Sequence, residues 1–200
     1  MTTSKPKNTA EIYFSDFKAN LDNIDIGQIV KVIELLKKKR QQQKTIFFVG
    51  NGGSAATASH AVCDLNKTVL GPDSGISSSL RFKTLCLSDN LPSITAIAND
   101  LSYDDIFSEQ LKNYAATGDL LIVITGSGNS PNILRALETA KDLNVETFGL
   151  LGFDGGKAKD LVDHVLLFKS QDYGIVEDAH MMIIHVITRY FKEYNLRNGA

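Results

Sequence analysis

The sequence predicts an α/β domain built on a parallel, doubly wound sheet of five strands. Five short apolar runs, rich in β-branched and aromatic residues, alternate with stretches that favour helix. Two of these runs end in loops rich in glycine and serine, where a parallel sheet of this type places its ligand. The chain has 200 residues, 43% of them hydrophobic, which is enough for one domain with a sizeable core. We therefore expect a flavodoxin-like sheet flanked by helices and preceded by an N-terminal pair of helices.

Charge and composition argue against several classes of partner. The formal net charge is −2 and the isoelectric point is about 6.1, so the chain has no basic field for a nucleic acid. Neither Cys63 nor Cys86 lies in a CxxC motif, which favours a reducing cytoplasm. The N-terminus lacks the pattern of a signal peptide, and no apolar run approaches the ~20 residues that span a bilayer. We expect a cytoplasmic protein with no nucleic-acid partner and no membrane partner.

The pattern divides the chain into three segments. Residues 1–9 are polar, and we expect a disordered lead there. Residues 10–44 carry two amphipathic helical stretches, at about 11–21 and 28–40, which a βα core does not need. We expect this segment to join copies of the chain in a homo-oligomer. Residues 45–195 should form the α/β core.

Within the core, strands and helices should follow one another in regular order. The predicted strands are 46–49, 82–88, 120–125, 146–151 and 164–168. The predicted helices are 54–66, 91–98, 103–114, 132–142, 157–162 and 175–194. Residues 71–79, rich in glycine, serine and proline, read as a loop.

The first strand ends in a glycine-rich turn, GNGGS at residues 50–54. Glycine permits positive φ and close backbone approach, and Ser54 is a suitable N-cap for the helix that follows. A strand, a turn and a helix start present backbone N–H groups that suit a phosphate. The chain has no GxxxxGK[ST] motif, and Ala55 interrupts GxGxxG, so we expect no nucleotide cofactor.

The third predicted strand ends in a second loop of this kind, TGSGNSP at residues 125–131. Hydroxyls and backbone N–H groups can surround a phosphate monoester without a lysine. Because both loops follow parallel strands, they open onto the same edge of the sheet. We therefore expect Ser54, Thr125, Ser127 and Ser130 to converge on one anion site.

Two helices carry groups that can titrate. His60 and Asp64 are four residues apart on the helix after the glycine turn, so they share a face. On the last helix, Glu177 and His180 are three apart, whereas His185 lies about 140° around the axis from His180. At most one of these two histidines therefore points where Glu177 points.

Several of these stretches resemble the SIS (sugar isomerase) domain family. They are VGNGGSAATASHAVCDL, GDLLIVITGSGNSPNILRALETAK, the segment 152–157 and VEDAHMMIIH, and the resemblance covers about residues 10–192. It implies a five-stranded parallel core, ketose–aldose isomerisation of a sugar phosphate, and a homotetramer whose sites are shared between subunits. The similarity is greatest to members that convert sedoheptulose 7-phosphate into D-glycero-D-manno-heptopyranose 7-phosphate through an enediol, for the synthesis of surface-polysaccharide heptose.

The resemblance also assigns roles to individual positions. Asp64 and His185 match the base and the acid of the family's isomerases. The positions that can hold one Zn²⁺ per subunit correspond to His60, Asp64, Glu177 and His185. The positions that contact the substrate or its phosphate correspond to Asn51, Gly52, Gly53, Ser54, Asp100, Thr125, Gly126, Ser127 and Ser130.

The chain departs from the family pattern at a few of these positions. Asp64 replaces a glutamate and is one methylene shorter, which moves a proton-transferring carboxylate by about 1 Å. Glu177 replaces a glutamine and adds a negative charge, so Glu177 is a second candidate for the base. Thr125 and Gly126 replace a Ser-Thr pair. Thr68 stands where the family has an arginine, with Lys67 as a stand-in.

Two other functions are compatible with the same residues. The chain could isomerise a different sugar phosphate, because nothing in the motifs measures the length of the sugar. Alternatively, it could be a non-catalytic SIS module that binds phosphosugars or a protein partner, because the family also contains members without turnover.

Overall fold

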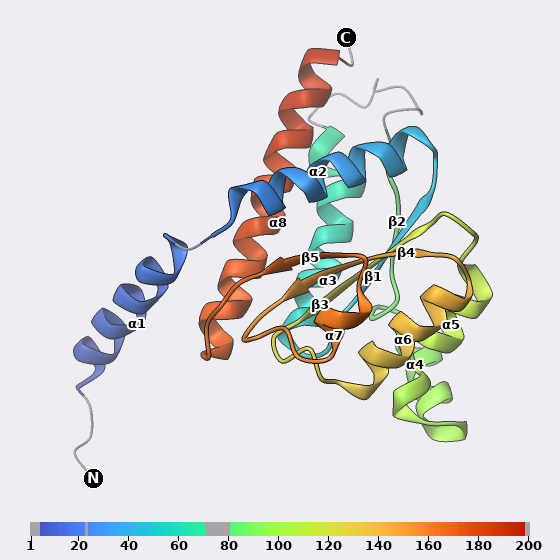
Figure 1. Ribbon diagram of the computed structural model, residues 1–200, viewed down its shortest axis with the longest axis horizontal. Helices are drawn as coiled ribbons and strands as arrows, with labels where there is room; N and C mark the ends of the chain where they lie inside the picture. The colour runs from blue at the N-terminus through green and yellow to red at the C-terminus, as the bar shows by residue number, and fades with distance from the viewer. Residues whose placement is uncertain (1–4, 23, 71–80, 199–200) are drawn as a thin grey trace.

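The computed structural model describes residues 5–22, 24–70 and 81–198, which form one five-stranded sheet with helices on both faces (Figure 1). The strand order is β2-β1-β3-β4-β5, and every neighbouring pair is parallel. This is the flavodoxin-like order that the sequence predicts. The strands are β1 Thr45–Val49, β2 Lys83–Cys86, β3 Leu120–Thr125, β4 Glu146–Leu151 and β5 His164–Leu167.

Eight α-helices and two short 3₁₀ turns lie within the described residues. The helices are α1 Pro6–Leu21, α2 Ile26–Gln41, α3 Gly53–Asn66, α4 Leu91–Asp100, α5 Ser108–Tyr114, α6 Pro131–Asp142, α7 Ala158–Leu161 and α8 Tyr173–Asn198. The 3₁₀ turns are η1 Thr68–Leu70 and η3 Tyr103–Asp105. No helix among the described residues is long and apolar enough to cross a membrane.

The sheet separates two apolar clusters. Along β1, Ile46 and Phe48 pack into the cluster with α2, α3 and α8, whereas Phe47 and Val49 pack into the cluster with α5, α6 and α7. This alternation follows from the two-residue period of a strand. All six residues of β3, the central strand, are buried. Burial on both faces explains why the β3 run LLIVIT is apolar throughout rather than alternating.

Helices α3 and α8 lie side by side on one face and run in the same direction (Figure 1). The direction follows from paired contacts: His60 on α3 meets His185 on α8, and one turn later Asp64 meets Thr188. Each helix follows a strand of the parallel sheet, so both begin at its carboxyl edge. This packing brings together titratable groups more than one hundred residues apart in the sequence.

The two N-terminal helices differ in how they pack. Helix α2 buries an apolar stripe that includes Ile29, Val32 and Leu36 against the sheet and α8. Helix α1 projects from the body of the molecule (Figure 1), and none of its residues is buried by the described part of the chain. Phe14 is 70% exposed, although Tyr13 and Phe17 pack beside the start of α8.

The structure corrects several expected boundaries. Residues 6–9, which we expected in a disordered lead, belong to α1, because the fixed φ of Pro6 suits the first turn of a helix. Ser54 is not the N-cap of α3. Gly52 occupies that position with a φ of 54°, and Ser54 is buried in the first turn. Residues 1–4 of the lead and the predicted loop at 71–79 lie outside the described residues.

One expected helix is divided. The stretch 103–114 forms η3 and α5, with Ile106 and Phe107 between them. The Ser102 hydroxyl accepts a hydrogen bond from the Asp104 N–H at the start of η3, which favours a tight turn there. Ile106 and Phe107 are almost completely buried beneath α6, so packing fixes the break.

Candidate active site

Three titratable side chains meet between α3 and α8. Nε2 of His60 lies 3.0 Å from Nε2 of His185 and 3.5 Å from Oδ2 of Asp64. One nitrogen or oxygen from each of these residues lies within 4.8 Å of the other two. Imidazole nitrogen and carboxylate oxygen are ligands that Zn²⁺ accepts. The structure thus brings together three of the four residues expected at a metal or proton-transfer site.

The Asp64 carboxylate is fixed from the buried side. The Thr188 hydroxyl donates a hydrogen bond of 3.0 Å to Oδ2 of Asp64, and both residues are buried. His60 and His185 are exposed, so the cluster opens towards the surface. The Asp64 carboxylate therefore contacts Thr188 on its buried side and faces the imidazoles of His60 and His185 on its exposed side.

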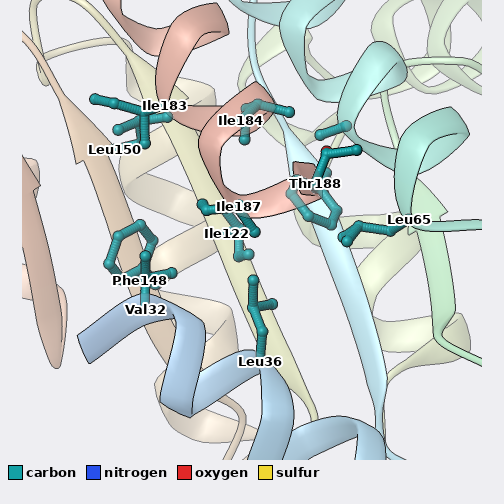
Figure 2. Close-up of a pocket in the computed structure, with 12 residues that line it drawn as sticks. Val32, Leu36, Leu65, Ile122, Phe148, Leu150, Ile183, Ile184, Ile187 and Thr188 are labelled. Atoms are coloured by element: carbon teal, nitrogen blue, oxygen red, sulfur yellow. The ribbon is translucent and has the colours of Figure 1, made fainter. Parts of the chain in front are cut away.

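A small cavity lies directly behind Thr188, between the sheet and the helices α2, α3 and α8 (Figure 2). Its walls are apolar side chains such as Leu36, Phe148 and Ile187. The cavity has about 20 Å³ of room, close to one water molecule, and a sugar phosphate needs a few hundred Å³. This cavity is a packing gap, and any ligand must bind elsewhere.

Glu177 does not join the group of His60, Asp64 and His185 within the described chain. Its carboxylate lies against Gly53 at the start of α3, where any side chain on Gly53 would collide with it. The reason is the geometry of α8. Eight residues separate Glu177 from His185, which is about 12 Å along a helix. The expected four-residue cluster is therefore wrong for a single copy of the chain.

His180 faces the interior of the protein and not the cluster. Its side chain is completely buried, and neither ring nitrogen forms a hydrogen bond with the described residues. Desolvation lowers the pKa of His180 from 6.5 to about 4, although the nearby Leu151 carbonyl opposes part of this shift. His180 is thus a neutral core residue, which the angle between His180 and His185 on the helix did not by itself predict.

The glycine turn after β1 is held by amide groups. The side chain of Asn51 forms two hydrogen bonds with the side chain of Asn132, at the start of α6. The Tyr103 hydroxyl donates a further bond of 3.3 Å to Oδ1 of Asn51. Gly52 takes the positive φ that lets the chain enter α3 directly after the strand.

The loop after β3 uses two of its own hydroxyls to hold its shape. Oγ1 of Thr125 accepts from the Gly128 N–H at 3.2 Å, and Oγ of Ser127 accepts from the Asn129 N–H at 3.3 Å. Gly128 has a φ of 64° and packs so closely on the loop after β4 that any side chain would collide with the Gly155 backbone. Thr125 and Ser127 therefore shape the loop, whatever else they contact.

The two loops lie next to each other because β1 and β3 are neighbours in the sheet, with Val49 opposite Val123. The position after Ser130 begins α6, but the Ser130 side chain makes no capping bond. That hydroxyl remains available to a ligand. The convergence of the four expected hydroxyls on one anion stays a prediction.

Asp100 and Gly126 complete the expected set. Asp100 is the exposed last residue of α4, and its carboxylate accepts a bond of 2.8 Å from the Asn99 amide. Gly126 lies beside the ring of Tyr173, which a side chain at that position would approach to 3.1 Å. A side chain at position 126 would therefore require the exposed Tyr173 ring to shift by a few tenths of an ångström.

Known proteins resemble this chain in sequence. The model of the SIS domain family matches residues 12–152. A phosphoheptose isomerase from Helicobacter pylori (strain Shi470) is 39% identical over 147 residues, which are 72% of this chain and 73% of that protein. Phosphoheptose isomerase 1 from Campylobacter jejuni subsp. jejuni serotype O:2 is 35% identical over 167 residues, which are 84% of this chain and 87% of that protein.

Solved structures resemble this chain in fold. A phosphoheptose isomerase from Neisseria gonorrhoeae matches with a TM-score of 0.85 at 24% identity, covering 94% of this chain and all of the other. One from Francisella tularensis matches with a TM-score of 0.87 at 22% identity, covering 95% of this chain and all of the other. The matched fold and the sequence relatives agree. This chain belongs to the SIS domain family.

Proposed function

We propose that this chain is a phosphoheptose isomerase, which converts sedoheptulose 7-phosphate into D-glycero-D-manno-heptopyranose 7-phosphate. The observation that carries the proposal is the cluster of His60, Asp64 and His185. It gives the chain a carboxylate and imidazoles within reach of one another. The 39% identity to a phosphoheptose isomerase supports the choice of substrate.

The residues can supply each proton transfer that the isomerisation needs. Asp64 as a carboxylate takes a proton from C1 of the open-chain ketose while His185 donates a proton to the oxygen on C2. The product of this step is an enediol. Asp64 then returns the proton to C2, and His185 takes back a proton from the oxygen on C1, which leaves the aldose. Proton transfer by a positioned group typically contributes about 10²–10⁴-fold to a rate.

The phosphate of the substrate would bind away from these groups. The turn at residues 50–54 and the loop at 125–131 end neighbouring strands, and each leads into a helix whose first N–H groups suit an anion. Ser54 and Ser130, on these two segments, are the hydroxyls that we propose as direct phosphate contacts. Asp100 would contact the sugar hydroxyls.

The donor set of the cluster also fits Zn²⁺, and we propose, as the alternative to the proton transfer by Asp64 and His185, that His60, Asp64 and His185 hold one ion per subunit. When bound, the ion would supply Lewis-acid polarisation of a sugar oxygen. Replacing His60 by alanine should then weaken Zn²⁺ binding by at least tenfold, measured by competition with a chromophoric chelator. His164, an exposed histidine on β5, is the matched control, and its alanine variant should bind Zn²⁺ like the wild type. Equal affinity in the wild type and the His60→Ala variant would contradict the assignment.

We propose that the chain is a homo-oligomer, and a tetramer in line with its family resemblance. Helix α1 supports association, because it exposes Ile12 and Phe14 and buries no residue within the described chain. Light scattering at micromolar concentration should therefore give a mass well above 21.9 kDa. A Phe14→Asp variant should shift the distribution towards the monomer. A wild-type monomer at that concentration would reject the proposal.

A direct assay tests the isomerase. Incubating the purified protein with sedoheptulose 7-phosphate, and in parallel with ketose phosphates of five and six carbons, should produce aldose signals by NMR only with the seven-carbon sugar. Turnover of a shorter sugar would assign a different substrate. Binding without turnover of any of these would favour the non-catalytic module, for which the shorter Asp64 and the displaced Glu177 are the supporting observations.

A further inference from the structure

Asn51 and Asn132 face each other as a reciprocal amide pair. Nδ2 of Asn51 donates to Oδ1 of Asn132 at 2.9 Å, and Nδ2 of Asn132 donates back to Oδ1 of Asn51 at 2.9 Å. Asn132 is almost completely buried, whereas Asn51 is half-buried. The pair joins the turn after β1 to the start of α6, and so connects the two loops of the candidate site.

Counting donors and acceptors shows what remains of the Asn51 amide. A carbonyl oxygen has two lone pairs, and Oδ1 of Asn51 accepts one bond from Asn132 and one from the Tyr103 hydroxyl. An amide nitrogen has two hydrogens, and one of those on Asn51 is donated to Asn132. The other hydrogen has no partner among the described residues. Because Asn51 is half-buried, this N–H can reach a ligand.

We propose that Asn51 meets the ligand only as a hydrogen-bond donor, and that Asn132 and Tyr103 are positioning residues that hold the amide in that orientation. The inference rests on the proposed function, because it assumes that the sugar phosphate binds at this turn. The group recognised by Asn51 is then an oxygen that accepts a hydrogen bond, such as the carbonyl oxygen of the open-chain sugar. It is not a hydroxyl that must donate.

This orientation is useful to an isomerase. Negative charge develops on the sugar oxygens as the enediol forms, and a fixed N–H donor stabilises that charge without having to reorganise. If the Asn51 side-chain amide could flip, it would present its oxygen instead of its N–H to the sugar oxygen for part of the time. Asn132 prevents Asn51 from turning alone, since that would place nitrogen against nitrogen and oxygen against oxygen. The Tyr103 hydroxyl, which donates to Oδ1 of Asn51, opposes a turn of both amides together.

The decisive variant is Asn132→Asp. A carboxylate still accepts from Nδ2 of Asn51, but it cannot donate to Oδ1, so the fixed orientation of Asn51 is lost. We expect kcat/KM for the seven-carbon ketose phosphate to fall about 10–100-fold, mostly through kcat. Asn113→Asp, on the exposed face of α5, makes the same change of charge elsewhere and should leave kcat/KM unchanged. Tyr103→Phe removes the hydrogen bond from the Tyr103 hydroxyl to Oδ1 of Asn51 but keeps both bonds between Asn51 and Asn132. It should therefore lower kcat/KM less than Asn132→Asp does.

A double-mutant cycle separates positioning from a general loss of structure. If Asn132 acts through Asn51, then Asn132→Asp should cost nothing further in an Asn51→Ala background. Losses that multiply in the double variant would overturn the inference, and so would wild-type activity in Asn132→Asp. Circular dichroism and thermal melting of each variant establish that it is folded. Asn132→Ser, which keeps a donor and an acceptor in less volume, provides a second route if Asn132→Asp does not fold.

The failure of the proposed function gives a different result. If the wild type binds sedoheptulose 7-phosphate without converting it, the isomerase is wrong, and the same cycle is read from dissociation constants measured by calorimetry. Non-additive losses of affinity would still support the positioning role, and additive losses would overturn it. If the wild type neither binds nor converts the sugar phosphate, both proposals are overturned.

Discussion

Replacing Asp64 by asparagine is expected to reduce turnover by several orders of magnitude and to leave the sugar phosphate bound. The amide keeps the size of the side chain and can still bond to Thr188, but it cannot accept a proton from carbon. We expect kcat to fall by about 10²–10⁴-fold, with a dissociation constant for the substrate that changes little. NMR turnover and calorimetric binding on the same preparation measure the two quantities separately.

Glu177 provides the control for this experiment, because it is the alternative base. In Glu177→Gln the amide replaces the carboxylate that lies against Gly53. Activity that is unchanged or improved would make Glu177 a bystander or a ligand. Complete loss in Glu177→Gln together with activity in Asp64→Asn would transfer the role of base to Glu177. His185→Ala should match Asp64→Asn in its loss of kcat if His185 is the acid.

Acid is expected to destabilise the folded protein through His180. The buried ring has a pKa of about 4, against 6.5 in the unfolded chain, so the unfolded state binds the proton more readily. The contribution of the neutral ring is complete above pH 6.5 and is lost progressively as the pH falls from 6.5 to 4. The full loss amounts to about 3 kcal/mol. Urea unfolding at fixed protein concentration, between pH 7.5 and pH 4, measures it.

His180→Leu isolates this effect from the other groups that titrate in acid. Leucine fills a similar volume without a buried nitrogen that lacks a partner. The variant should equal or exceed the wild type in free energy of unfolding at pH 7.5. The difference between the two should grow in favour of the variant as the pH falls. His180→Met gives a second, more flexible replacement. A constant difference in the free energy of unfolding across this range would mean that His180 is not kept neutral by the fold.

Apolar patterning was enough to predict the sheet. The three central strands, β1, β3 and β4, are buried on both faces beyond their first residue at most, so their runs are mostly apolar, and the parallel order follows from the helices between the runs. Local signals were weaker at helix ends. Ser54 has good N-cap chemistry, but Gly52 takes the cap because it adopts a positive φ that serine disfavours, and packing then buries Ser54 in the first turn.

The candidate site was predictable where spacing on one helix decides the geometry. His60 and Asp64 share a face because they are four residues apart, and this holds whatever packs against them. Contacts between helices were not predictable in the same way. Thr188 and Asn132 act on Asp64 and Asn51 from other elements, and neither has a sequence pattern that marks it. The position of Glu177 within one copy was not predictable for the same reason, since its neighbour Gly53 depends on how far α8 is shifted along α3.

The position of Glu177 also affects how strongly the start of α3 would bind an anion. The first N–H groups of a helix carry partial positive charge, and the protein already places a carboxylate of its own against Gly53 at that end. A phosphate bound at this turn would therefore meet a like charge unless the Glu177 side chain turned away. The repulsion would be larger for a phosphate dianion than for a singly charged ligand.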